Sequence, residues 1–217
     1  MPWSLKSWRA SVASACAVVL LLAPPLAAAA PPPPAALAQH EPELRGIVAK
    51  AISTAACFPD KFDSAVWFTL MEPKLRRIVS EPAERMKIIA TAFCEAHRPG
   101  EQRLPPGLVM AVMDVESRFN RWAVSSAGAV GLMQVMPFWP AELGMKQHQL
   151  TQIESNTRMG CAILRYYLKR EKNDVRKALA RYNGSVGSRK YPDLVVTRWT
   201  TRWNGADDLG TTATVRR

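Results

Sequence analysis

The sequence is poor in histidine and cysteine: its 217 residues include 3 histidines and 4 cysteines. A transition-metal site needs several such side chains at short, regular spacings. The cysteines that follow the first thirty residues, Cys57, Cys94 and Cys161, are far apart, and the histidines are scattered. The sequence therefore predicts no metal site, and nothing in it calls for another cofactor.

Long apolar runs are also missing. The run Ala10–Ala23 is shorter than the roughly 20 residues that a membrane-spanning helix needs. Lys6 and Arg9 precede it, and small residues follow it up to Ala30, which is typical of a secretory signal peptide. We therefore expect residues 1–30 to be a signal peptide and the protein to be periplasmic. A retained membrane anchor is the less favoured alternative.

Acidic residues are few: 18 Asp and Glu stand against 29 Lys and Arg, and the formal net charge is +11. Such a surplus indicates an anionic partner, which could be nucleic acid, an anionic membrane surface or an acidic polymer. Loss of Lys6 and Arg9 with the signal peptide would leave +9. Export argues against nucleic acid, so no nucleic-acid partner is expected.

An odd number of cysteines remains after the signal peptide, which in an oxidising compartment suggests one disulfide and one leftover thiol. Cys57 and Cys94 both lie in the N-terminal segment, whereas Cys161 stands among the apolar residues of an expected core helix. We therefore predict a Cys57–Cys94 disulfide. By the loop-closure model it would contribute roughly 3 to 4 kcal/mol.

The hydrophobic content of 48% and the charged content of 22% are those of a globular protein. Apolar residues recur at helical spacing, and few segments alternate with period two, so the predicted fold is mostly α. The expected organisation is an Ala/Pro-rich linker over 31–43, a helical segment over 44–104, a second helical region over 105–205 and a loose tail over 206–217.

Individual helices are indicated by start signals and apolar spacing. Ser80 is the expected cap of a helix whose first turn holds Pro82 and whose apolar stripe includes Met86, Ile89 and Phe93. The remaining expected helices span 44–52, 106–119, 151–172, 175–182 and 192–203.

One carboxylate stands on the apolar face of the expected helix 106–119. With Leu108 at zero and about 100° per residue, the apolar side chains fall between about −20° and +100°, and Glu116 falls at about 80°. Burial raises the pKa of a carboxyl and makes it a competent general acid. The structural alternative is a helix-end glutamate paired with a buried arginine. Asp114 and Arg118, on the other side, are expected to form a solvated i,i+4 pair.

The stretch from Ser125 to Pro137 is too apolar for an idle surface loop. Gly128 and Gly131 bracket small residues and permit close backbone approach. Gln134 can both donate and accept hydrogen bonds, as an acetamido sugar requires. By its shape alone, the stretch is equally consistent with a buried connection between helices.

Taken in order, these motifs resemble those of soluble lytic transglycosylase (family 1, SLT) domains, which share a lysozyme-like fold with goose-type lysozymes. The resemblance covers about 105–203, and it implies a mostly α, lysozyme-like (goose-type) helical domain. The motifs are Glu116-Ser117, Ser125-x-x-Gly128-Ala-x-Gly131-Leu-Met-Gln134-Val-Met136-Pro137, Asn156 before Gly160, and Ala180-Arg-Tyr182-Asn183.

The resemblance implies that Glu116 is the catalytic acid and base of a glycan-cleaving site. The residues that match substrate-binding positions are Ser125, Gln134, Met136, Tyr182 and Asn183. Tyr182 matches the aromatic residue near the catalytic carboxylate, with a core tyrosine as the structural alternative. Three positions depart from the family pattern, namely Arg121, Ile163 and Gly184-Ser185.

The implied activity is that of an exported peptidoglycan lytic transglycosylase, which cleaves the MurNAc–GlcNAc β-1,4 bond and leaves 1,6-anhydro-MurNAc ends. A goose-type hydrolase is an alternative, although glycoside hydrolysis normally uses two carboxylates and the next acids, Glu142 and Glu154, lie outside the motifs. A non-catalytic glycan-binding or secretion-apparatus scaffold is another. We expect a monomer that acts on peptidoglycan strands, with an association with cell-wall or secretion machinery left open.

Overall fold

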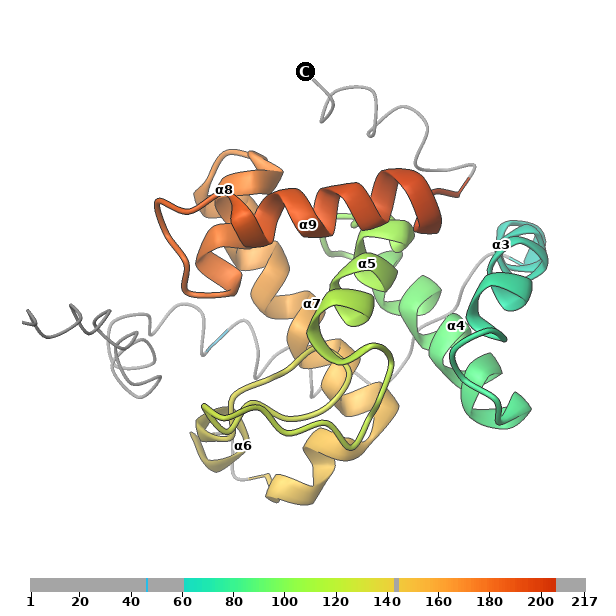
Figure 1. Cartoon of the computed structure of the whole chain (residues 1–217), viewed down its shortest axis with the longest axis horizontal. Helices are drawn as coiled ribbons and strands as arrows, with labels where there is room; N and C mark the ends of the chain where they lie inside the picture. Colours follow the sequence, from blue (N-terminus) through green and yellow to red (C-terminus); the bar gives the residue numbers. More distant parts are fainter. Residues whose placement is uncertain (1–45, 47–60, 143–144, 206–217) are drawn as a thin grey trace, which may run out of the picture. The chain divides into compact units, whose positions relative to one another are not determined.

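The computed structural model describes residues 46, 61–142 and 145–205, and the described part is built from helices (Figure 1). Two isolated antiparallel bridges, Val124 with Val130 and Val130 with Val135, are its only β pairings. The predicted mostly α architecture is confirmed. The elements are α3 (Lys61–Leu75), α4 (Pro82–Ala96), α5 (Pro106–Ser117), α6 (Phe138–Glu142), η1 (Gln147–Thr151), α7 (Ile153–Arg170), α8 (Val175–Tyr182), α9 (Lys190–Arg198) and η2 (Trp199–Trp203).

Helix α5 forms the centre of the fold. It begins at Pro106, whose missing N–H costs nothing in a first turn, and every residue from Pro106 to Asp114 is buried. Helices α4 and α9 and the π-helical turn η2 pack around it (Figure 1). A helix that is apolar all round is expected in this central position.

Helix α5 ends two residues earlier than predicted. Arg118 and Phe119 have φ values of 53° and 63°, so both adopt the left-handed conformation that stops a helix. The Phe119 side chain is buried and lies edge-on to Trp203, with ring centroids 5.0 Å apart. This contact fixes the turn that carries the chain out of α5.

The predicted start of α4 is partly wrong. The cap is Glu81 rather than Ser80, because the Glu81 carboxylate accepts a hydrogen bond from the Ala83 N–H at 3.2 Å. Met86 is 42% exposed and does not belong to the buried stripe. The buried side chains of α4 are those of Arg85, Ile88, Ile89, Thr91, Ala92, Phe93, Glu95 and Ala96.

The C-terminal helices follow the predictions closely. Helix α7 lies within the expected 151–172, and α8 has the expected bounds because Asp174 caps it by accepting from the Lys177 N–H at 3.0 Å. The expected helix 192–203 is divided into α9 and η2. Helix α7 buries Cys161 as a free thiol, as expected of the leftover cysteine.

Several predictions lie outside the described residues: the signal peptide over 1–30, the linker over 31–43, the helix over 44–52 apart from residue 46, Cys57 and the tail over 206–217. The Cys57–Cys94 disulfide therefore stays a prediction. Within the described ranges, no helix is both long and apolar enough to cross a membrane.

Candidate active site

Glu116 lies in the last turn of α5 and is half-buried. Its Oε1 accepts a hydrogen bond from the Tyr191 hydroxyl at 2.5 Å, a length typical of an O–H donor on a carboxylate. Burial raises the pKa of Glu116 from 4.5 to about 7, and the Tyr191 bond opposes this rise. Near neutral pH, Glu116 is therefore present in both the protonated and the ionised form.

Tyr191 is the contact that the sequence analysis missed. It lies in the first turn of α9, 75 residues after Glu116, and the predicted helix start at Pro192 excluded it. Burial and the Glu116 charge raise the pKa of Tyr191 well above its usual value, so the hydroxyl stays protonated and donates. The packing of α9 against α5 supplies this contact.

The turn Gly131–Gln134 is attached to three helices through its backbone. The Ser117 hydroxyl donates to the Leu132 carbonyl, the Asn156 Oδ1 accepts from the Met133 N–H, and the Tyr182 hydroxyl donates to the Met133 carbonyl, each at 2.8 Å. Ser117 comes from α5, Asn156 from α7 and Tyr182 from α8. Three of the motif residues therefore hold one turn beside the end of α5.

The glycines of the motif are required by close approaches. Gly131 has a φ of 84°, and a Cβ there would collide with the Leu150 carbonyl and the Asn156 side chain. At Gly160 a Cβ would lie 2.5 Å from the Met133 Sδ. These two positions admit no larger residue without movement of the turn.

Two of the residues that match sugar-binding positions also brace the loop. The Ser125 Oγ accepts from the Ala129 N–H at 3.0 Å. The Gln134 Nε2 donates to the Ala123 and Gly131 carbonyls at 3.2 and 3.0 Å. Since both amide protons of Gln134 are engaged, its Oε1 is the atom that could receive a donor from a sugar.

The remaining predicted contacts lie around this loop. Met136 is half-buried against the core, and Asn183 is exposed just after α8. The Tyr182 hydroxyl bonds to the Met133 carbonyl rather than to Glu116, although the Glu116 charge contributes to the raised pKa of Tyr182. The sugar-binding roles of these residues stay predictions.

The predicted solvated pair of Asp114 and Arg118 is wrong. Asp114 is only 7% exposed, and its Oδ2 accepts from the Trp203 Nε1 at 2.9 Å. Arg198 and Arg202 each lie 3.9 Å from the same oxygen. Helical spacing within α5 could not reveal these partners, which come from α9 and η2.

The helices thus place a half-buried glutamate, with a pKa near neutrality, beside a turn that requires glycine, and such a glutamate is a candidate general acid. Among the described residues, no group of three or more His, Cys, Asp or Glu side chains could hold a metal ion.

Comparison with known proteins gives a family match. Residues 94–192 match the model of the transglycosylase SLT domain. The match confirms the recognition of a soluble lytic transglycosylase domain, and with it the lysozyme-like fold class. It begins about ten residues before the region that the motifs covered.

Curated relatives carry transglycosylase names. The chain is 56% identical over 34 residues to the membrane-bound lytic murein transglycosylase C of Actinobacillus pleuropneumoniae serotype 5b. This match covers 16% of the chain and 9% of the relative. The chain is also 37% identical over 104 residues to the transglycosylase of Enterobacteria phage PRD1, and this match covers 44% of the chain and 38% of the relative. The chain thus spans well under half the length of these relatives. A search of the solved structures gave no significant match.

Proposed function

We propose that the protein is an exported peptidoglycan lytic transglycosylase that cleaves the MurNAc–GlcNAc β-1,4 bond and leaves 1,6-anhydro-MurNAc ends. The SLT domain and the names of the relatives support the class of enzyme. The observation that carries the reaction is the burial of Glu116 at the end of α5, beside the Tyr191 hydroxyl, and this burial raises the pKa of Glu116 to about 7. A group that must act first as an acid and then as a base works best with a pKa near the operating pH.

In the proposed reaction, protonated Glu116 gives its proton to the glycosidic oxygen, and the bond between that oxygen and C1 of MurNAc breaks. The GlcNAc end leaves as the free alcohol. The 6-hydroxyl of the same MurNAc then attacks C1, and its proton passes to the Glu116 carboxylate. The enzyme returns to its starting protonation state, and no water is consumed.

Tyr191 positions Glu116 in this scheme. Its hydroxyl is bound to Oε1, which leaves Oε2 as the oxygen that exchanges the proton with substrate. The bond also moderates the rise in the pKa of Glu116 that burial causes. Without it, the pKa would be higher still, and the carboxyl would be a weaker acid in the first step.

The alternative of a goose-type hydrolase would call for a second carboxylate to activate water. The nearest acid along α5, Asp114, is occupied by Trp203 and two arginines. Glu154 is paired with Lys87 at 2.7 Å. Both of these acids are engaged by other side chains, which favours the reaction without water.

The test is digestion of purified peptidoglycan by the full chain and by Glu116→Gln. We expect anhydro-ended products from the wild type and none from the variant, which keeps an acceptor for Tyr191 but has no proton to give. Glu84→Gln, which alters a surface carboxylate on α4, is the matched control and should digest normally. Mass analysis that finds reducing ends as the main product would instead indicate a hydrolase, and no soluble product would indicate a scaffold.

The localisation and partners remain part of this proposal. We infer a periplasmic, monomeric enzyme that acts on peptidoglycan strands, in which the basic charge holds the protein near an anionic wall. Fractionation of cells, together with the mass of the purified protein in solution, tests these statements.

A further inference from the structure

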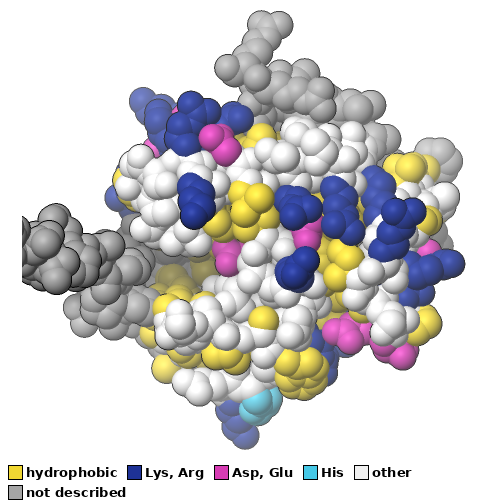
Figure 2. Space-filling model, in the orientation of Figure 1, with side chains coloured by type: hydrophobic (Ala, Val, Ile, Leu, Met, Phe, Trp, Pro, Cys, Tyr) yellow, Lys and Arg dark blue, Asp and Glu magenta, His cyan; other side chains and the backbone are white. Residues whose placement is uncertain are grey.

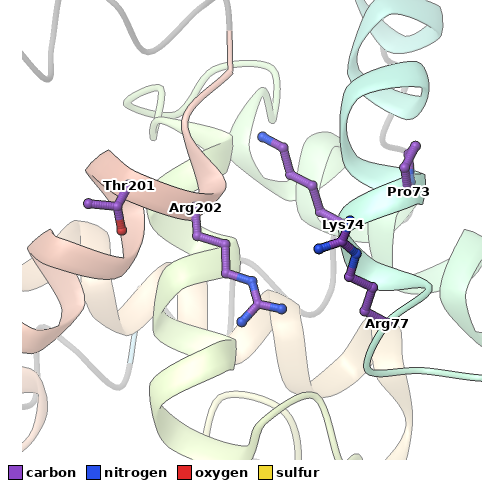
Figure 3. A pocket seen from close by; sticks show the side chains of 5 residues that line it. All are labelled: Pro73, Lys74, Arg77, Thr201 and Arg202. Carbon is purple, nitrogen blue, oxygen red and sulfur yellow. The ribbon is translucent and has the colours of Figure 1, made fainter.

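A basic hollow lies between α3, α5 and the α9–η2 segment. One part of it, of about 520 Å³, is lined by residues that include Arg118, Arg198 and Leu194. The adjoining part, of about 320 Å³, is lined by Pro73, Lys74, Arg77, Thr201 and Arg202 (Figure 3). Arg77 and Arg202 line both parts. Figure 2 shows the same feature as Lys and Arg side chains gathered along α9 and toward α3.

The hollow carries an excess of positive charge. Its lining includes five cationic side chains and one carboxylate, and these are Lys74, Arg77, Arg118, Arg198, Arg202 and Asp114. The carboxylate is buried and already engaged by the Trp203 N–H. Because like charges repel one another, such a concentration is unfavourable unless an anion offsets it.

The arginines of the hollow fall into two groups. Arg198 and Arg202 are oriented by Asp114, and Arg202 also lies over the Trp203 ring, 5.1 Å from its centroid. Arg77 and Arg118 are exposed, and the described part of the chain offers neither of them an ion pair. These two guanidinium groups are available to a ligand.

The hollow adjoins the Glu116 site. Val115 lines it and directly precedes Glu116. On α9, Tyr191, Leu194 and Arg198 are spaced so that they share one helix face. Tyr191 contacts Glu116, whereas Leu194 and Arg198 line the hollow. A polymer that follows this face of α9 from Glu116 would therefore meet the arginines of the hollow.

We propose that this hollow binds the carboxylates of the stem peptide on the glycan strand that is being cut. The proposal rests on the proposed function. A guanidinium group pairs with a carboxylate through two parallel hydrogen bonds, and Ile78, Val115 and Leu194 supply apolar surface for the methyl groups of a peptide. The combined volume suits a short peptide segment.

The test compares glycan strands that carry stem peptides with strands from which an amidase has removed them. Binding of fluorescently labelled strands is measured by anisotropy on the Glu116→Gln background, so that turnover plays no part. The variant is Arg77→Gln with Arg118→Gln, two exposed positions. The matched control is Arg103→Gln with Lys172→Gln, which removes the same charge from exposed positions near the opposite end of α5.

We expect the hollow variant to bind peptide-bearing strands about three- to tenfold more weakly, as for the loss of two partly exposed charge pairs, with no change for peptide-free strands. The control should change neither. Equal weakening on both substrates, or no weakening, would overturn the proposal. Reduced binding to phosphatidylglycerol vesicles with unchanged strand binding would overturn it too, and would assign the hollow to an anionic membrane. Failure of the proposed function is recognised separately, because the wild type would then release no anhydro-ended products.

Discussion

Burial of Glu116 should make the free energy of unfolding depend on pH. The folded-state pKa of about 7 lies above the ordinary value of 4.5. Between these values the folded protein binds more protons than the unfolded chain, so stability falls as pH rises through this window. The contribution of Glu116 to stability is fully retained below about pH 4.5 and is lost above about pH 7. Each pKa unit corresponds to about 1.4 kcal/mol, so the loss amounts to about 3 kcal/mol.

Glu116→Gln removes the charge that burial penalises, and its side-chain oxygen can still accept from Tyr191. We expect the variant to match the wild type near pH 4 and to exceed its free energy of unfolding by about 3 kcal/mol near pH 8. In thermal unfolding this corresponds to about 6 to 12 °C for a domain of this size. The loss of activity and the gain in stability would then share one cause.

The assay is thermal and urea unfolding of the full chain at a series of pH values, followed by circular dichroism. Glu84→Gln on α4 serves as the control for the loss of one negative charge. A stability difference between Glu116→Gln and the wild type that stays constant across the pH range would refute the reasoning. In that case, Glu116 would not be desolvated in the folded protein.

Three further predictions concern single side chains. Tyr191→Phe removes the hydrogen bond that lowers the pKa of Glu116. The alkaline limb of the pH–rate profile for peptidoglycan digestion should therefore move up by about 1 to 2 pH units. An alkaline limb that stays in place would contradict this prediction. Gly131→Ala should lose at least about 2 kcal/mol in urea unfolding, because its Cβ would meet the Leu150 carbonyl at a left-handed φ. Burial raises the pKa of the Cys161 thiol to about 12, so mass spectrometry should find alkylation only after unfolding.

Helices with local start signals could be predicted from the sequence. Pro106 begins α5 and Asp174 caps α8, and in both cases the signal lies within a few residues of the helix start. Glu116 was also detectable, because a carboxylate on an apolar face violates the pattern of its own helix. What these successes share is that the information is local in the chain.

The errors at the site concern contacts between distant segments. Asp114 was expected to be solvated with Arg118, but its partner Trp203 lies 89 residues away. Tyr191 reaches Glu116 across 75 residues. Neither contact leaves a periodic pattern, because each depends on how α9 and η2 pack against α5. The one sign of such a distant contact in the sequence is a polar residue that has no evident partner nearby in the chain.

The strongest motif of the sequence describes a support for the chemistry more than the chemistry itself. The backbone of the Gly131–Gln134 turn is held by Ser117, Asn156 and Tyr182. These bonds join α5, α7 and α8 at one turn, so a change in any of them would move the loop relative to Glu116. A single carboxylate can serve as both acid and base only if the substrate is held still around it. The turn must therefore be held in a fixed position, and many residues serve that purpose although only one group transfers the proton.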